Sequence, residues 1–270
     1  MPTDGQKSKR KLGFCVKKIK VAVAGAYGKM GSETCKSVAA APDMELLAGI
    51  VHTRRQEVEL PNVPYYTNIR ECLIDTSPDV LVDFTHAEAA RQNILTSIEM
   101  GIRPIIGTTG FQPQELVDYD RILRDAEIGG LYAPNFAIGA LLMMKVSTMI
   151  VPFLSDVEII EYHHPGKKDA PSGTAKKTAE KLFNAMKDKS EKAHFHHPGK
   201  AEFIDGIPVH SVRLPGFIAH QEVIFGGQGE RLTIRHDTMS RESFMPGVLL
   251  GIRSIQSVNG LVDGLEHFLF

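Results

Sequence analysis

Two histidines and a lysine lie within five residues of one another and have the chemistry for moving a proton beside an acidic ligand. Residues 161–175 read EYHHPGKKDAPSGTA, which brings His163, His164 and Lys167 into one short segment. A histidine can donate a proton near neutral pH, and a lysine supplies positive charge beside an anion. We interpret these three side chains as the chemical core of an active site.

A helix start that binds an anion is predicted directly after this core. Ser172, Gly173 and Thr174 follow a proline and precede apolar residues at helical spacing over 175–186. The free N–H groups at such a start, together with the helix dipole, favour a carboxylate or a phosphate. The segment therefore predicts a pocket in which a small acidic molecule is reduced.

A metal site or a surface histidine pair is the alternative interpretation of His163 and His164. Adjacent residues on a strand point to opposite faces, so they rarely bind one ion together. We therefore favour catalysis and predict no bound metal. A partial copy of the motif, HHPGK at 196–200, lacks the DAPSGTA part. With His194 it could hold a transition metal loosely, but we favour a solvated loop.

A glycine-rich turn near the beginning of the chain predicts dinucleotide binding. Residues 25–31 read GAYGKMG and lie between a short apolar run and a helical pattern. Glycines let the backbone turn sharply and let a pyrophosphate approach the helix start. A plain strand-to-helix turn can also carry glycines, so the interpretation depends on this context.

The residues after the second apolar run bear on the choice of cofactor. They read VHTRR at 51–55 and lack the carboxylate that would bind the ribose of NAD. His52, Thr53 and the two arginines, Arg54 and Arg55, would suit a 2′-phosphate, which favours NADPH over NADH. A solvated basic turn remains the alternative.

Three further short motifs follow apolar runs. They are DFT at 83–85, GTTG at 107–110 and APNF at 133–136. In an open parallel sheet, ligands bind in the crevice outside the carboxyl ends of the strands. We therefore expect these three motifs to face the same ligand.

Strand and helix patterns alternate in the first half, which predicts an α/β, Rossmann-type parallel sheet domain. Strands are predicted over 19–24, 45–51, 79–84, 103–106 and 130–133, and helices over 30–40, 87–100 and 114–127. The tail, 244–270, is predicted to be helical and to return to this domain. We place the dinucleotide-binding domain at 1–134 and 242–270, with 1–18 as a mobile leader.

The second half predicts an α+β domain built on an open mixed sheet that is mostly antiparallel. Strands are predicted over 156–163, 209–214, 221–225 and 231–237, with a hairpin loop at 226–230, one clear helix at 173–187 and a loop at 187–200. This substrate-binding and oligomerisation domain is placed at 135–241. Hinges near 134–137 and 241–244 would let the two domains close on a ligand.

Composition limits the partners of the chain. It has 270 residues and a formal net charge of −1, which does not suggest nucleic acid or a membrane surface. Three widely spaced cysteines do not suggest a disulfide framework, so we expect a cytoplasmic protein. The exposed face of an open sheet needs a cover, and a second copy of the chain is the simplest one, which predicts a homo-oligomer.

The motifs GAYGKMG, DFT, GTTG, APNF and EYHHPGKKDAPSGTA, in this order, resemble those of the 4-hydroxy-tetrahydrodipicolinate reductase family. The resemblance spans about residues 20 to 270. It implies a homotetramer of two-domain chains that uses NADPH or NADH to reduce a cyclic dicarboxylate in lysine and diaminopimelate biosynthesis, with release of water.

The resemblance also implies roles for individual residues. His163 is similar to the catalytic proton donor, and Lys167 to a second donor or electrostatic partner. The implied substrate contacts are His164, Ser172, Gly173 and Thr174. The implied cofactor contacts are Gly25, Ala26, Tyr27, Gly28, Lys29, Met30, His52, Thr53, Arg54, Gly107, Thr108, Thr109, Ala133, Pro134, Asn135 and Phe136. Many members have an acidic residue where this chain has His52 and Thr53, which leaves the cofactor preference open.

Two other functions remain as alternatives. The first is an NAD(P)H-dependent reductase of another small acidic carbonyl compound, which would share the glycine-rich turn but has no need of the HH-x-x-K pattern before SGT. The second is a non-catalytic NADP(H) sensor, which would not need His163 or Lys167.

Overall fold

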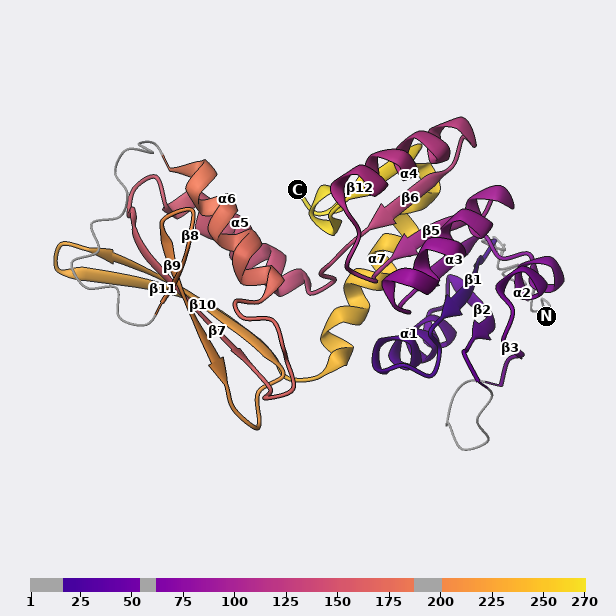
Figure 1. The fold of residues 1–270 in the computed structure, drawn as a ribbon, viewed down its shortest axis with the longest axis horizontal. Helices are drawn as coiled ribbons and strands as arrows, with labels where there is room; N and C mark the ends of the chain where they lie inside the picture. Colours follow the sequence, from indigo (N-terminus) through magenta and orange to yellow (C-terminus); the bar gives the residue numbers. More distant parts are fainter. Residues whose placement is uncertain (1–16, 54–61, 187–200) are drawn as a thin grey trace, which may run out of the picture.

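The computed structural model describes residues 17–53, 62–186 and 201–270. Figure 1 shows two sheet-containing parts, which the chain connects twice, before α5 (Ile138–Ile150) and after β11 (Glu230–Thr238). The leader up to residue 16, Arg54, and the HHPGK copy at 196–200 lie outside the described residues. No helix in the described ranges is long and apolar enough to cross a membrane.

The first part is a parallel sheet of seven strands, in the order β12-β6-β5-β4-β1-β2-β3. Its strands are β1 (Ile19–Ala24), β2 (Met44–Ile50), β3 (Tyr65–Tyr66), β4 (Val80–Asp83), β5 (Arg103–Ile106), β6 (Gly129–Tyr132) and β12 (Gly260–Asp263). The chain runs outward from β1 in one direction through β2 and β3, and then in the other direction from β4. This reversal between β1 and β4 opens a crevice at the carboxyl ends of the two strands.

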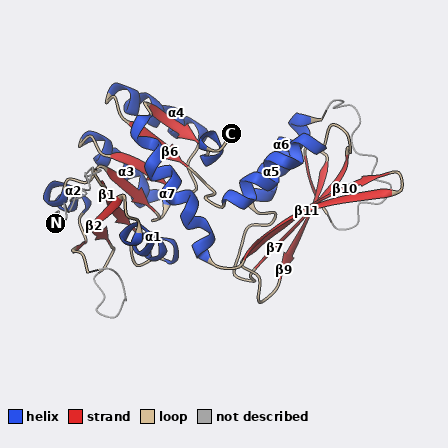
Figure 2. Cartoon of the chain, turned by 180° about the vertical axis from the view of Figure 1, so that it is seen from behind, coloured by secondary structure: helices blue, strands red, loops and turns tan. Residues whose placement is uncertain are grey.

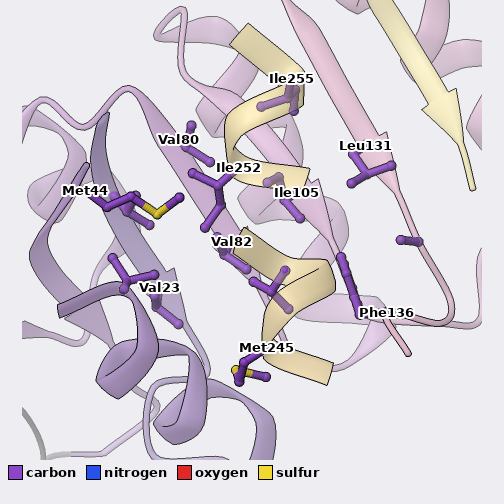
Figure 3. Packing of buried hydrophobic residues seen from close by; sticks show 14 of the residues in the cluster. Val23, Met44, Val80, Val82, Ile105, Leu131, Phe136, Met245, Ile252 and Ile255 are labelled. Carbon is purple, nitrogen blue, oxygen red and sulfur yellow. The ribbon is translucent and has the colours of Figure 1, made fainter. Parts of the chain in front are cut away.

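Helices cover both faces of this sheet, because its strands are apolar on both sides (Figures 1 and 2). Val21 and Val23 point into one core, and Ala22 and Ala24 into another. The helices are α1 (Lys29–Ala40), α2 (Ile69–Thr76), α3 (Ala87–Glu99), α4 (Pro113–Asp125) and α7 (Met245–Ser254). Figure 3 shows the larger core, in which Ile252 and Met245 of α7 pack against strand residues such as Val82.

The prediction of a helical tail was correct for α7 and wrong for residues 260–263. These four residues form β12, which pairs in parallel with β6 and extends the sheet by one strand. The backbone N–H of Leu261 donates to Oδ1 of Asp120 on α4 at 2.7 Å. A strand of four residues is too short for its periodicity to be distinguished from that of a helix.

The second part is a mixed sheet of five strands, in the order β11-β10-β7-β9-β8. The strands are β7 (Asp156–His163), β8 (Glu202–Ile204), β9 (Ile207–Arg213), β10 (Ala219–Gly227) and β11, and only the β7–β9 pair is parallel. The predicted hairpin loop at 226–230 is a shorter turn, because β10 and β11 extend to Gly227 and Glu230. The strand predicted at 156–163 matches β7, those at 221–225 and 231–237 lie within the longer β10 and β11, and the one at 209–214 starts two residues later than β9 and ends one residue after it.

Two helices, α5 and α6 (Gly173–Ala185), cover one face of this mixed sheet (Figure 1). Val157, Ile159, Val223 and Phe225 point from the sheet into a core that includes Leu182 of α6. The prediction of a single helix in this part was therefore incomplete. The segment that forms α5, IGALLMMKVSTMI, is apolar nearly all round, so it lacks the polar stripe that marks a surface helix.

The other face of the mixed sheet carries polar and charged side chains. Glu222 and Arg235 pair across β10 and β11, and Nε2 of His210 lies 2.9 Å from Oε2 of Glu158. Tyr162 on β7, the strand next to β10, donates a hydrogen bond from its hydroxyl to Oε1 of Glu222 at 3.1 Å. Within the described ranges, the helices that pack against this sheet, α5 and α6, lie on its opposite face.

Candidate active site

The glycine-rich turn after β1 has a backbone that only glycine accommodates at two positions. Gly25 has a φ of +78°, and a Cβ placed on it would lie 2.7 Å from the carbonyl oxygen of Phe84. A Cβ on Gly31 would lie 2.0 Å from the carbonyl oxygen of Gly25. The turn is therefore compact because Gly25 and Gly31 have no side chains, and it leads directly into α1.

The start of α1 fits the phosphates of a dinucleotide. Gly28 is the residue that caps the helix, and it supplies no side-chain hydrogen bond. Among the described residues, the amides of Lys29 and Met30 have no acceptor, and the first turn contains no acidic side chain. Exposed amides at the positive end of a helix are an anion site.

A cavity of about 480 Å³ adjoins this turn, at the carboxyl ends of β1, β2 and β4. Five residues predicted to contact the cofactor line it: Gly25, Tyr27, Gly28, His52 and Thr53. Phe84 and Thr85 of the DFT motif also line it, together with Thr67, His86 and Asn93, which had not been assigned to the site. Ala26 and Met30 instead pack in the large core, so any contact they make with a ligand there is through the backbone.

A buried carboxylate holds two of the predicted motifs together. Asp83 is 1 % exposed and accepts hydrogen bonds from the N–H and the hydroxyl of Thr85, at 2.9 and 2.6 Å. It also accepts from the hydroxyl of Thr108 at 3.0 Å and from Nδ2 of Asn93 at 2.7 Å. The ends of β4 and β5 and the helix α3 are therefore fixed relative to one another by one side chain.

A second cavity, of about 260 Å³, lies between the two sheet-containing parts, and we call it the central cavity. It is lined by Thr109, Pro134 and Asn135, which follow β5 and β6, and by His163, Lys167, Ser172, Gly173 and Thr174. The structure thus brings eight predicted residues from three segments of the sequence to one small cavity. Asp169, Lys177 and Glu266 line it too, and the sequence had not singled them out.

Not every predicted residue reaches a cavity. His164 is exposed, and it is absent from the linings of both cavities. Ala133 and Phe136 are buried in the large core, where the ring of Phe136 packs edge-on against Phe84 with their centroids 5.7 Å apart. Gly107 lies beneath the ring of Phe84, which leaves no room for a Cβ.

The start of α6 resembles that of α1, because it also has backbone amides without an acceptor in the described ranges. Ser172 caps the helix, with its hydroxyl oxygen accepting from the N–H of Ala175 at 3.2 Å. Within the described ranges, the amides of Gly173 and Thr174 have no acceptor, and both residues line the central cavity. This helix start therefore offers two N–H donors to an anion in the cavity.

His163 ends β7 and contacts a buried carboxylate. Its Nδ1 is hydrogen-bonded to Oε2 of Glu161, and its side chain is 13 % exposed. Glu161 is fully buried and receives two hydrogen bonds from Arg213, at 2.8 and 2.9 Å. Burial works against the charge of Glu161, but hydrogen bonds from His163, Arg213 and Ser211 outweigh it and lower the pKa of this carboxyl to about 2.

Lys167 lies on the loop between β7 and α6, and its Nζ is 2.9 Å from Oδ1 of Asp169. Burial opposes the charge of Asp169, yet the hydrogen bond and the positive charge of Lys167 lower the pKa of the Asp169 carboxyl. Across the cavity, Glu266 near the end of the chain pairs with Lys177 at 3.5 Å and Lys181 at 3.2 Å. The lining therefore carries two lysines, Lys167 and Lys177, each paired with a carboxylate, and an acidic ligand could take the place of either carboxylate beside its lysine.

The described residues contain no group of three His, Cys, Asp or Glu side chains that could hold a metal ion. Sequence reasoning missed Glu161, which contacts the candidate proton donor, and Arg213, which contacts Glu161. Glu161 had a local signal, because residues two apart on a strand share a face and Glu161 precedes His163 by two. Arg213 had none, since it is separated from Glu161 by 52 residues.

Comparison with known proteins matches both parts of the chain to one family. The model described as "Dihydrodipicolinate reductase, N-terminus" matches residues 19–136, and the one described as "Dihydrodipicolinate reductase, C-terminus" matches residues 139–269. A 4-hydroxy-tetrahydrodipicolinate reductase from Lactococcus lactis subsp. cremoris is 47% identical over 264 residues, covering 93% of this chain and 98% of the relative. The one from Geobacillus kaustophilus is 43% identical over 267 residues, with 93% and 99% covered.

A solved structure of a dipicolinate-bound dihydrodipicolinate reductase from Paenisporosarcina sp. TG-14 superimposes with a TM-score of 0.83 at 38% identity, covering 93% of this chain and 99% of that one. An amine dehydrogenase from Mycobacterium smegmatis shares only the fold, with a TM-score of 0.62 at 11% identity, covering 90% and 94%. With both family models matched and relatives of this identity over almost their whole length, the chain belongs to the dihydrodipicolinate reductase family.

Proposed function

We propose that this chain reduces 4-hydroxy-tetrahydrodipicolinate to tetrahydrodipicolinate with NAD(P)H and loss of water, a step in lysine and diaminopimelate biosynthesis. One observation carries the proposal. His163, Lys167 and the free amides of Gly173 and Thr174 line the same small cavity as Asn135, which follows a strand of the dinucleotide-type sheet. The names of the relatives and the dipicolinate bound to the Paenisporosarcina reductase support it.

The cofactor would lie over the turn at 25–31, with its phosphates on the amides of Lys29 and Met30. When bound, it supplies a hydride to the substrate ring. His52 and Thr53 line the cavity where the ribose of the adenosine would lie, and neither is acidic. For this reason we propose a preference for NADPH, with Arg54 as the partner of the 2′-phosphate.

The substrate would place a carboxylate on the amides of Gly173 and Thr174, with Lys167 beside it. An anion held by two amides and an ammonium group is oriented as well as bound. Lys177, one turn further along α6, lines the same cavity and adds positive charge for the second carboxylate. We propose that His164 contacts the substrate only after the two parts close around it.

The chemical role of the protein in the reduction is to supply a proton where charge develops. We propose His163 as the proton donor and Lys167 as the group that assists it. A positioned general acid of this kind accelerates a reaction by about 10²–10⁴-fold. The cavity also removes the reacting ring from bulk water, which strengthens both electrostatic contacts.

We propose that residues 1–134 with 242–270 form the cofactor-binding unit and 135–241 the substrate-binding unit. The chain passes between the two sheets at 133–137 and 239–244, so bending at 134–137 and 241–244 would close the cavity. We also propose that the polar outer face of the mixed sheet is covered by other copies of the chain in a cytoplasmic homotetramer. No helix of the described residues covers the outer face of the mixed sheet (Figure 1), and this supports the proposal.

The test is an assay of NADPH and NADH oxidation with freshly made cyclic substrate, alongside a panel of keto acids. Turnover of the cyclic dicarboxylate, with little or none of the keto acids, is the expected result. Turnover of a keto acid alone would point to another reductase, and tight cofactor binding without any turnover would point to a sensor. Arg54→Ala should reduce the rate with NADPH more than with NADH, and equal losses would refute the proposed role of Arg54.

A further inference from the structure

Glu161 and His163 share the inner face of β7, because residues two apart on a strand point to the same side. We propose that Glu161 is a positioning residue: it fixes the ring orientation and tautomer of His163 and ties them to the start of α6. This inference rests on the proposed role of His163 as the proton donor. Glu161 itself lies outside the linings of the central cavity, so it acts through its neighbours.

The contact between the two side chains determines which ring nitrogen is free. An ionised carboxylate only accepts hydrogen bonds, so Nδ1 of His163 must donate its hydrogen to Oε2 of Glu161. The other nitrogen, Nε2, is then the atom that gains and loses a proton. A neutral His163 therefore carries its hydrogen on Nδ1, and a protonated one donates from Nε2.

Arg213 keeps Glu161 charged and in place. Its Nη1 donates to Oε2 of Glu161 at 2.9 Å and its Nη2 to Oε1 at 2.8 Å, which is a two-pronged ion pair. The same guanidinium donates to the carbonyl oxygens of Val212 at 2.9 Å and Asp169 at 2.7 Å. Glu161 is thus held by a group that is itself anchored to β9 and to the loop carrying Lys167.

Glu161 also contacts the anion-binding helix start. Its Oε1 accepts from the backbone N–H of Ser172 at 3.2 Å, the residue immediately before the free amides of Gly173 and Thr174. One carboxylate therefore contacts the candidate proton donor through one oxygen and the candidate anion site through the other. This arrangement sets the place of the His163 ring relative to a bound carboxylate.

Other charged and titratable groups also face His163 and enter its pH dependence. Those that line a cavity with it or surround its partner are Lys167, Asp169, Lys177, Arg213, His220, His236 and Glu266. Of these, Arg213 touches the carboxylate of Glu161 directly. Replacing Glu161 by glutamine removes one negative charge next to the imidazole and leaves all of these groups in place.

The first experiment compares Glu161→Gln with Glu161→Asp and with Glu180→Gln, a matched control on the exposed side of α6. Glu161→Gln should lower kcat by about 10–10²-fold, since loss of a partner that orients a reacting group commonly costs this much. The KM for NADPH should not change. Glu161→Asp should recover part of the loss, and Glu180→Gln should match the unmutated enzyme.

The pH profile separates positioning from a merely structural role. A neighbouring carboxylate favours the charged form of an imidazole, so the basic limb of kcat/KM should move to lower pH in Glu161→Gln. Unchanged kcat, or a loss of kcat with no displacement of the limb and no recovery in Glu161→Asp, would overturn the inference.

A second measurement needs neither a variant of Glu161 nor the substrate. Nitrogen-15 NMR of the imidazole groups in the full-length protein, with the His163 signals assigned by their loss in His163→Gln, reports which nitrogen carries the hydrogen. The expected result at a pH where the ring is neutral is hydrogen on Nδ1, and hydrogen on Nε2 would overturn the inference even if Glu161→Gln does not fold. Failure of the unmutated enzyme to turn over the cyclic dicarboxylate would instead count against the proposed function.

Discussion

Asn135 donates a hydrogen bond from Nδ2 to Oγ1 of Thr174 at 3.4 Å, across the boundary between the two parts of the molecule. Its Oδ1 meanwhile accepts from the N–H of Ala137 at 2.8 Å, which fixes the orientation of the amide. One side chain therefore links the segment after β6 to the first turn of α6. Both residues line the central cavity, so this contact helps to set its shape.

Removal of that link should weaken catalysis without unfolding the protein. In Asn135→Ala, we expect kcat/KM for the cyclic substrate to fall by about 10–10²-fold, because a displaced helix start misaligns the bound carboxylate. Steady-state kinetics measures the effect, and Gln114→Ala on the exposed side of α4 is the control. An unchanged kcat/KM in Asn135→Ala would mean that the link does not position the site.

Removal of the candidate proton donor should lower turnover and spare the cofactor. His163→Ala should reduce kcat by about 10²–10⁴-fold, the range of a lost general acid. The dissociation constant of NADPH should stay nearly the same, since His163 lies outside the lining of the cavity beside the glycine-rich turn. A kcat within about twofold of the unmutated enzyme would exclude His163 from proton transfer.

Asp83 should matter for stability as well as for the cofactor cavity. Asp83→Ala would leave the buried Nδ2 of Asn93 and the hydroxyl of Thr108 without their acceptor. Each unsatisfied buried group costs about 1–3 kcal/mol, so we expect the free energy of unfolding to fall by about 3 kcal/mol. Denaturant unfolding measures this loss. The control is Asp118→Ala, whose side chain is 47% exposed, and equal effects of the two variants would contradict the role of Asp83.

Acid should destabilise the molecule through Glu161. The pKa of this carboxyl is lowered from 4.5 to about 2 in the folded state. A group whose pKa is lowered on folding contributes stability that is complete above its ordinary pKa and is lost as the pH falls toward the folded value. The unfolding free energy should therefore drop as the pH falls from 4.5 to about 2.

The measurement is a series of denaturant unfolding curves over that pH range. Glu161→Gln has no carboxyl at this position to titrate, so its stability should depend less steeply on pH than that of the unmutated protein. Parallel pH dependences for the two proteins would show that Glu161 does not carry the acid sensitivity.

Much of the fold and of the candidate site follows from local sequence signals. The glycines at 25–31 are required by a backbone turn, and the strands of the first sheet are short apolar runs, so both leave a clear pattern. Motifs after successive parallel strands share one edge by geometry, which is why Thr109 and Asn135 were expected near one ligand. They do line one cavity, although their roles in it stay predictions.

The missed elements have weak local signals. α2 is only eight residues long, and its start is marked by Asn68, whose side chain accepts from the N–H of Glu71 at 3.2 Å. β3 has two residues, and it is a strand only because it pairs with β2. Both α2 and β3 are too short to show a periodic pattern of apolar residues in the sequence.

The missed site residues depend on contacts between distant parts of the chain. Arg213 meets Glu161 because β9 pairs in parallel with β7, and this pairing is not visible in either segment alone. Glu266 meets Lys177 because the end of the chain returns to the first sheet next to α6. Composition and spacing cannot report such contacts, since they arise from topology.

A crystal structure of the protein with NADP⁺ and pyridine-2,6-dicarboxylate, a flat mimic of the product ring, tests the central claim most directly. We predict one carboxylate on the amides of Gly173 and Thr174, with Nζ of Lys167 in contact with the ligand and Nε2 of His163 facing its ring. Density for the dicarboxylate elsewhere, with the side chains of His163 and Lys167 turned to solvent, would contradict the proposed site.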